Sequence, residues 1–390
     1  MRCHRFGWSI FAASLIAIAF AAIDAFGEVN EGPSEVMTLA MARHVSEGEI
    51  SGAVTICYQE GRPPYGAVVG LANIQNKQPM HLDTLFGVMS MTKPITAAAL
   101  MILVDEGKLS LDDRVDEYIH AFADAKTKSG EPVRGLTVRH VLTHTSGLTG
   151  DQGCEVSLAA TANELAKRPF AFQPGEKWEY GPSLNVCGRI IEVVSGQAYD
   201  DFLKQRIFEP LGMNETTFHP TDEQRERLAE LYELSENRKS LVPTERILGI
   251  GEPDCVPNPS GGLFSTAGDM LAFYRVFLGR GESQGKRILS ADAVREMTRV
   301  QTGDLTTGFT PGNAWGLGWC IVREPQGVSG MLSPGTFGHG GYYGTQGWVD
   351  PVKKRIFVLM YQRAGLPNSD ASEIRREFQQ LAVEAFQSGR

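Results

Sequence analysis

The chain has 390 residues, of which 42% are hydrophobic and 21% charged, and its formal net charge is -9 at pH 7. This composition is typical of a folded globular protein and excludes a disordered chain. The negative charge is spread along the sequence, which argues against nucleic acid as a partner. Because single cores tend to divide beyond about 250–300 residues, we expect two lobes.

The N-terminus carries two arginines and then an apolar run over 8–23. This order is typical of a secretory signal peptide, with cleavage near Gly27 and with Ala22 or Ala25 as alternative sites. The other interpretation, an uncleaved membrane anchor, would need about 20 apolar residues. We therefore predict a signal peptide at 1–27, an exported (periplasmic or secreted) protein, and no membrane span after cleavage.

The cysteines form no Cys-x-x-Cys pair, and we predict no metal and no cofactor. Six cysteines in a chain of this length are too few and too scattered for a disulfide-built scaffold. Cys154 and Cys255 both lie in loops rich in Gly, Pro and Asp. Export permits a disulfide between them, which we state as a hypothesis.

In chain order, the first predicted element is a helix over 34–47, where apolar residues recur at helical spacing. Two strands follow at 52–58 and 65–73, separated by a Gly-Arg-Pro-Pro turn. From about 85 to 255 the pattern is mostly helical, and the helices stop at Gly or Pro. One further helix, in FSTAGDMLAFYRVFLG, precedes short β runs in AWGLGWCIV, GTFGHGG, YGTQGWVDP and RIFVLMYQ.

The chain closes with an amphipathic helix over about 371–386. Strands at both ends with helices between them predict an α+β fold, an α/β sandwich in which one antiparallel sheet combines N- and C-terminal segments. Helices flank this sheet, and a mostly helical lobe is inserted. We divide a single domain at 28–390 into an α/β lobe (28–84 and 256–390) and a helical lobe (85–255).

Ser90-Met91-Thr92-Lys93 precedes a long apolar helical run, so we expect Ser90 near a helix start with Lys93 at i+3 on the same face. A serine hydroxyl is a poor nucleophile unless a neighbouring base takes its proton. The free N–H groups and positive dipole end of a helix N-terminus also favour attack on a carbonyl. Because Ser-x-x-Lys recurs by chance as a capping serine beside a solvated lysine, the motif needs partners.

Further segments supply such partners. In order along nearly the whole mature chain, they look like the signature segments of the class C β-lactamase and penicillin-binding-protein-like serine hydrolases. These segments are FGVMSMTKPITAAALMILVDEGKLSLDDRV, LTVRHVLTHTSGL, PGEKWEYGPSLNVCGRIIEVVSGQ, IFEPLGM, GGLFSTAGDM and FGHGGYYGTQGWVDP. The resemblance implies a β-lactamase/transpeptidase-like fold and an activity among carboxylesterases, transesterases and D-amino-acid peptidases.

The resemblance also implies three catalytic roles: Ser90 is acylated, Lys93 assists proton transfer, and Tyr180 acts as base and later activates the deacylating water. For a tyrosine to act as a base near pH 7, its pKa must fall by about three units, or about 4 kcal/mol. A lysine ammonium about 4 Å away supplies an effect of that size. A neutral Lys93 acting as the base remains an alternative.

The segment FGHGGYYG resembles the third family motif, a strand beside the serine. By this resemblance, the backbone N–H groups of Ser90 and Tyr342 form the oxyanion hole, in which one donor is typically worth about 2.7–4 kcal/mol. His339 stands where many relatives carry lysine. Gly340 and Gly341 would leave room for substrate against the strand.

Two positions depart from true class C β-lactamases. Pro182 replaces the asparagine of Tyr-x-Asn, whose amide recognises the acylamino carbonyl of the antibiotic, and Ser183 or Asn185 could substitute for it. His339, largely neutral at pH 7, weakens recognition of a substrate carboxylate. Both changes favour neutral esters over β-lactams and peptides.

We therefore predict an exported serine hydrolase that acts on a small-molecule ester or amide, nearest in its motifs to the carboxylesterase branch. His339, Gly340, Gly341 and Ser183 are the predicted substrate-binding residues. The alternatives are a β-lactamase or D-alanyl-D-alanine carboxypeptidase/D-aminopeptidase and, from another class, a non-hydrolytic penicillin-binding or sensing module. The Gly-x-Ser-x-Gly elbow of α/β-hydrolases does not occur in the chain.

Overall fold

The computed structural model describes residues 31–150, 156–246 and 255–388. The predicted signal peptide and Cys154 lie outside these residues, so the hypothesised disulfide stays a hypothesis. In this part of the chain, no helix is long and apolar enough to cross a membrane.

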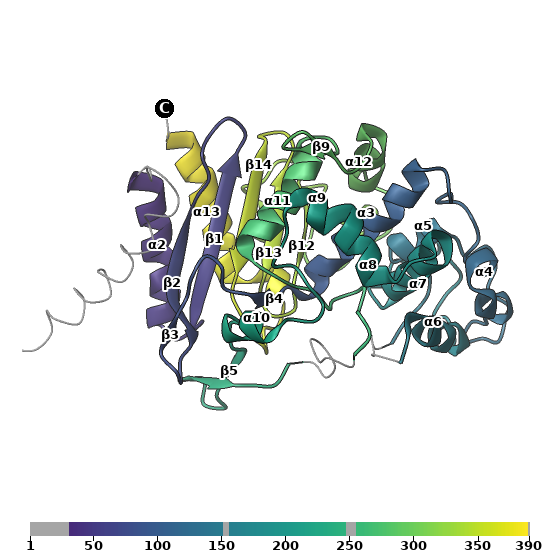
Figure 1. Ribbon diagram of the computed structural model, residues 1–390, viewed down its shortest axis with the longest axis horizontal. Helices are drawn as coiled ribbons and strands as arrows, with labels where there is room; N and C mark the ends of the chain where they lie inside the picture. The colour runs from purple at the N-terminus through teal and green to yellow at the C-terminus, as the bar shows by residue number, and fades with distance from the viewer. Residues whose placement is uncertain (1–30, 151–155, 247–254, 389–390) are drawn as a thin grey trace, which may run out of the picture.

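An eight-stranded antiparallel sheet forms the middle of the molecule (Figure 1), in the order β10-β11-β12-β13-β14-β1-β2-β3. N- and C-terminal segments meet where β1 pairs with β14, with Val54 opposite Met360. This arrangement confirms the predicted α+β fold. The strands are β1 (Gly52–Gln59), β2 (Tyr65–Asn73), β3 (Gln78–Pro79), β10 (Asn313–Trp315), β11 (Cys320–Val322), β12 (Phe337–Gly340), β13 (Gln346–Asp350) and β14 (Arg355–Met360).

The sheet is covered on both faces, which explains why β14 is a continuous apolar run. Ile356, Val358 and Met360 point to one core and Phe357 and Leu359 to the other, because successive side chains alternate along a strand. The terminal helices α2 (Glu31–Ser46) and α13 (Glu373–Ser388) pack together over the second core (Figure 1). On the other face, α11 (Ala267–Leu278) packs against β1, β13 and β14.

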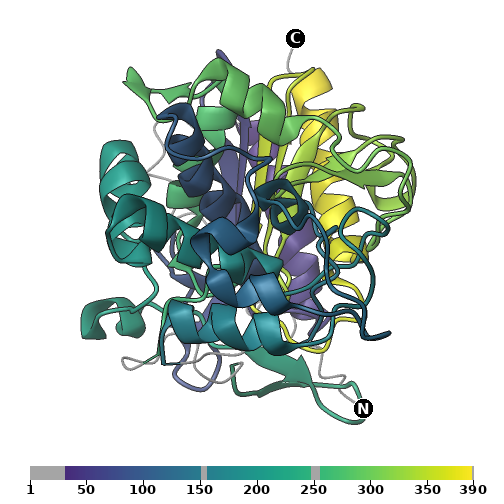
Figure 2. The same ribbon diagram turned by 90° about the vertical axis from the view of Figure 1, so that its right-hand side faces the viewer.

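The inserted helical lobe lies to one side of the sheet in Figure 1 and faces the viewer in Figure 2. Its central helix α3 packs against α7, and both belong to the same apolar core as α11. The lobe contains α3 (Thr92–Asp105), α4 (Val115–Tyr118), α5 (Val138–Leu142), α6 (Leu158–Lys167), α7 (Ser183–Ser195) and α8 (Tyr199–Leu203). The next two helices, α9 (Glu209–Leu211) and α10 (Asp222–Glu226), are drawn closer to the sheet in Figure 1. Helix α12 (Ala291–Thr298) lies later in the chain, between α11 and β10.

Short elements connect the lobe to the sheet. A two-stranded ladder of β4 (Phe86–Gly87) and β7 (Phe264–Ser265) leads directly into the 3-10 turn η2 (Met89–Met91) and then α3. The turn η2 also packs against β12. The remaining elements are η3 (His120–Asp124), the π-helical turn η4 (Lys204–Phe208), β5 (Tyr232–Leu234), β6 (Leu241–Pro243), β8 (Glu282–Ser283), β9 (Lys286–Arg287), η5 (Gly327–Ser329) and η6 (Ser369–Ala371).

Candidate active site

Ser90 occupies the single turn η2, directly before α3. The preceding residue, Met89, has φ 50°, a left-handed conformation that is uncommon for a residue with a side chain. Met89 and Met91 are buried and fix the turn from both sides, while Ser90 is only partly buried. The Nζ atom of Lys93 lies 3.1 Å from the Ser90 Oγ, so the expected i+3 contact is present.

Lys93 is fully buried at the start of α3. Its Nζ donates a hydrogen bond to the carbonyl of Ser260 at 2.6 Å and lies 4.6 Å from the centre of the Tyr180 ring. The Ser260 backbone is held in turn by its N–H, which donates to the Asn185 side chain at 3.1 Å. Burial lowers the pKa of Lys93 well below its ordinary value, so the uncharged amine is favoured.

Burial raises the pKa of Tyr180, although a hydrogen bond with Ser90 acts in the opposite direction. The expectation that Lys93 lowers this pKa is therefore wrong for this structure. Moving the hydroxyl proton of Tyr180 to the Lys93 amine would leave the total number of protons unchanged. It would, however, create an ammonium and a phenolate, and so place two charges in a buried site. The uncharged pair is favoured, which leaves Lys93 with a lone pair beside Ser90.

His144 holds the Tyr180 segment from both sides. Its carbonyl accepts from the Glu179 N–H at 2.9 Å, its Nδ1 accepts from the Gly181 N–H at 3.4 Å, and its ring centre lies 4.5 Å from that of Tyr180. The residue has φ 57° and is fully buried. Burial lowers its pKa well below the usual range, with Lys93 as a smaller cause. The structure thus supports an ordering role for His144.

Ser183 was expected to contact substrate. The structure corrects this expectation, because Ser183 is 1% exposed and its Oγ lies 3.1 Å from Nδ1 of His144. The hydroxyl therefore supports His144. Asn185 is equally buried and serves Ser260, so neither residue replaces the missing asparagine at Pro182.

His339 lies at the end of β12 and is 2% exposed. Its Nδ1 lies 2.7 Å from the Gly340 carbonyl, which can only accept, so Nδ1 carries the proton. Burial, with Lys93 as a smaller cause, lowers the pKa of His339 to about 3, although the hydrogen bond with the Gly340 backbone acts in the opposite direction. The imidazole is therefore neutral at pH 7, as the sequence predicts.

Gly340 and Gly341 allow close packing of the chain on itself, which corrects the expectation that they leave room for substrate. A Cβ at Gly340 would lie 2.0 Å from Oδ1 of Asp370, and one at Gly341 would lie 2.5 Å from the Val88 carbonyl oxygen. The second contact brings the turn after β12 against the residues that precede Ser90. Within the described chain, the Tyr342 N–H donates to no other backbone carbonyl, which suits a donor for an oxyanion.

Aromatic side chains enclose Tyr180. The Phe309 ring meets the Tyr180 ring edge-on at 4.7 Å, while Trp178 and Trp315 lie 6.3 and 6.0 Å away between ring centres. Phe309 has φ 75° and remains 40% exposed, so it forms the rim of the site. Trp178 lies in the Tyr180 segment that we matched to the family. Nothing in the sequence around Phe309 indicates its place.

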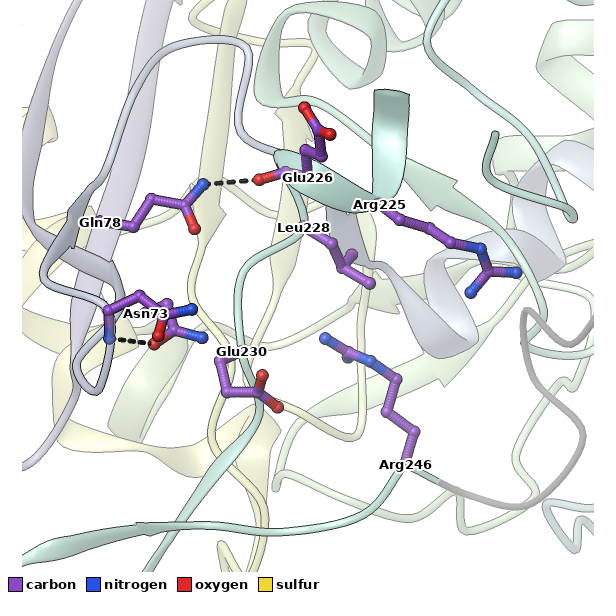
Figure 3. A pocket seen from close by; sticks show the side chains of 8 residues that line it. Asn73, Gln78, Arg225, Glu226, Leu228, Glu230 and Arg246 are labelled. Carbon is purple, nitrogen blue, oxygen red and sulfur yellow. Dashed lines mark hydrogen bonds between the residues drawn. The ribbon is translucent and has the colours of Figure 1, made fainter. Parts of the chain in front are cut away.

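The structure also shows a hollow of about 550 Å³ away from these residues (Figure 3). It is polar, and Arg246 at its edge donates to the side chain of Gln362 and to the Ala229 carbonyl. Ser90, Lys93 and Tyr180 do not line it, so we do not assign the substrate to it. The lining residues are Asn73, Asn76, Gln78, Arg225, Glu226, Leu228, Glu230 and Arg246.

Two groups of residues have spacings that metal ligands could use. His140 and His144 are four residues apart, but α5 ends between them, and Nδ1 of His140 accepts from the Thr137 N–H. In the described residues, His44 lies near Glu47 and Glu49. Each ring nitrogen of His44 already faces a carboxylate at 2.6 Å, one from Glu49 and one from Glu377. Both groups are explained by contacts within the protein.

Comparison with known proteins agrees with this geometry. The Beta-lactamase family model matches residues 34–382. Esterase EstB of Burkholderia gladioli is 30% identical over 82% of this chain and 87% of that protein. Penicillin-binding protein 4 of Amycolatopsis lactamdurans is 32% identical over 68% of each chain.

Among solved structures, EstCE1, described as a hydrolase with promiscuous acyltransferase activity, superimposes with a TM-score of 0.77. It is 23% identical, and the match covers 90% of this chain and 97% of that chain, so it supports the fold. With the family model matched across nearly the whole described fold and with relatives that include an esterase and a penicillin-binding protein, the chain belongs to the β-lactamase family of serine hydrolases.

Proposed function

We propose that this protein hydrolyses small acyl esters through an acyl-enzyme on Ser90. The observation that carries the proposal is the contact of 3.1 Å between the Ser90 Oγ and a buried Lys93 amine. A nucleophile within hydrogen-bond reach of its base is the geometry that serine catalysis requires. The N–H groups of Ser90 and Tyr342 are the proposed oxyanion donors.

In the acylation step, Lys93 takes the Ser90 proton as Oγ attacks the ester carbonyl. The oxyanion then collapses, the bond to the alcohol breaks, and Tyr180 delivers a proton to the departing oxygen while Lys93 restores the Tyr180 proton. In deacylation, the same pair takes a proton from water, water attacks the acyl carbonyl, and Ser90 regains its proton. Each half-reaction returns Lys93 and Tyr180 to their uncharged forms.

Esters are favoured over β-lactams by what surrounds the nucleophile. Pro182 offers no amide, and Ser183 and Asn185 are buried in contacts of their own. His339 is neutral where a cation would bind the carboxylate of an antibiotic. Similarity to esterase EstB supports the same choice. Similarity to penicillin-binding protein 4 supports β-lactam or D-alanyl peptide hydrolysis as the second candidate.

The test is a burst of p-nitrophenol from p-nitrophenyl butyrate, followed by slower turnover. Ser90→Ala should abolish both phases, whereas Ser46→Ala, an exposed serine at the end of α2, should leave them unchanged. Unreduced turnover in Ser90→Ala would exclude the mechanism. Faster hydrolysis of nitrocefin than of the ester would favour the second candidate, and a permanent penicillin adduct without turnover would favour a binding module.

We further propose that the domain at 28–390 acts outside the cytoplasm after removal of residues 1–27. The support is the N-terminal order of arginines, apolar run and small residues. Within that domain, we propose one lobe at 28–84 with 256–390 and a second, mostly helical lobe at 85–255. Mass measurement of the exported chain should show an N-terminus near residue 28, and an intact N-terminus retained in the cytoplasm would exclude export.

A further inference from the structure

The Gly340 carbonyl determines which ring nitrogen of His339 carries the proton. Because Nδ1 donates to the Gly340 carbonyl, the neutral ring presents Nε2 as a lone pair. This Nε2 is buried and has no hydrogen-bond partner among the described residues. An unpaired buried acceptor costs free energy, which a hydrogen-bond donor on a substrate would recover.

A carboxylate lies at the same strand end. Asp370, in η6, packs against Gly340: its Oδ1 would lie 2.0 Å from a Cβ atom added at this glycine. Its only described side-chain hydrogen bond is a long contact of 3.4 Å from Gln346 Nε2, and its side chain is 17% exposed. The negative charge of Asp370 contributes to raising the pKa of Tyr180. The carboxylate is thus close to the reacting groups, and besides this long hydrogen bond it forms an ion pair of 3.9 Å with Nη1 of Arg375.

Two basic side chains lie nearby, but contacts within the protein occupy both. Lys93 donates to the Ser260 carbonyl and lies against Ser90. Arg375 is fully buried, with its guanidinium carbon 3.9 Å from the Trp348 ring centre, and it donates to the backbone carbonyl of Asp370. Neither is placed to receive a substrate carboxylate.

The alcohol part of an ester would meet these groups. The Tyr180 and His339 ring centres are 6.0 Å apart. Since Tyr180 delivers the proton to the departing alcohol in the proposed function, on which this inference rests, the alcohol lies on the His339 side. We propose that this subsite selects alcohols by hydrogen bonding: Nε2 of His339 accepts from a hydroxyl group on the leaving alcohol, and Asp370 disfavours a carboxylate there.

Three butyrate esters with the same acyl group test the inference: propyl butyrate, 2-hydroxyethyl butyrate and O-butyryl glycolate. Burial raises the pKa of Asp370 while Arg375 lowers it, so release of butyric acid is titrated at about pH 8.5 to keep Asp370 ionised. For the wild type we expect kcat/KM to be about tenfold higher for the hydroxyethyl than for the propyl ester, and lowest for the glycolate.

His339→Phe should bring the hydroxyethyl to propyl ratio close to one. Asp370→Asn should raise the glycolate to propyl ratio about tenfold, whereas Glu373→Gln, which removes an exposed charge three residues away, should not change it. Because both kcat/KM values in a ratio are measured on the same variant, the ratio does not depend on the fraction of that variant that is folded. Flat ratios with good propyl butyrate turnover would overturn this inference alone, and no turnover of any ester would overturn the proposed function.

Discussion

The burial of Lys93 and its proposed role in proton transfer both require an uncharged amine. The amine has no carboxylate hydrogen-bonded to it in the described chain, donates to one carbonyl and sits in a fully buried position. A lysine of this kind loses its charge more readily than a solvated one. The base that sequence reasoning preferred, Tyr180, instead holds its proton more tightly.

This difference between Lys93 and Tyr180 predicts which of two variants slows acylation more. Lys93→Met should slow acylation of Ser90 by about 1,000-fold or more, because it removes the base. Tyr180→Phe, which keeps the ring contacts, should slow acylation by only about 10–100-fold. Stopped-flow burst rates with p-nitrophenyl butyrate measure both, and the reverse order would assign the base to Tyr180.

His339 makes stability depend on pH. Its folded pKa of about 3 lies below the unfolded value near 6.5, so between these values the unfolded chain binds more protons. The stabilisation is complete above about pH 6.5 and is lost as the pH falls towards 3, by about 3 kcal/mol at pH 4. In urea unfolding at pH 7 and pH 4.5, His339→Gln should lose less stability than the wild type. Equal losses would contradict the burial of a neutral imidazole.

The turn after β12 is the element that aligns the proposed oxyanion donors. Gly341→Ala places a methyl group 2.1 Å from the Thr345 Oγ1 and 2.5 Å from the Val88 carbonyl oxygen, so the turn must move away from η2. We expect kcat to fall by about 100-fold, comparable to the loss of one oxyanion donor. Gly268→Ala, whose Cβ meets nothing closer than 3.8 Å, is the control in α11 and should keep full activity. Equal activity in both variants would exclude the alignment role.

The sequence predicted the elements whose apolar residues recur at strand or helix spacing. The strands β1, β2 and β14 follow their predicted runs, because alternation and apolar runs record burial directly. The contact between Ser90 and Lys93 also followed from helical spacing. The pKa of Tyr180 did not, because it depends on burial by the aromatic ring of Phe309 and others distant in sequence. Asp370 was likewise missed, since only the folded chain brings it to Gly340.

At the scale of the whole molecule, a partly buried polar contact joins the two terminal helices. Glu377 on α13 accepts from Arg43 on α2 and lies 2.6 Å from Nε2 of His44, which is 1% exposed. Glu377→Gln should lower the free energy of unfolding by about 1–2 kcal/mol through the His44 contact. Glu373→Gln, an exposed carboxylate one turn earlier, should change it little. Urea midpoints compare the two, and equal midpoints would show that the contact adds no stability.

The pairing of β1 with β14 also determines when the protein can fold. Val54 pairs with Met360, about 300 residues later, so the hairpin of β1 and β2 has an unpaired edge until β14 is available. Contacts between such distant segments slow folding. The nucleophile, between the sheet and the helical lobe, is therefore fully assembled only after β14 has paired with β1.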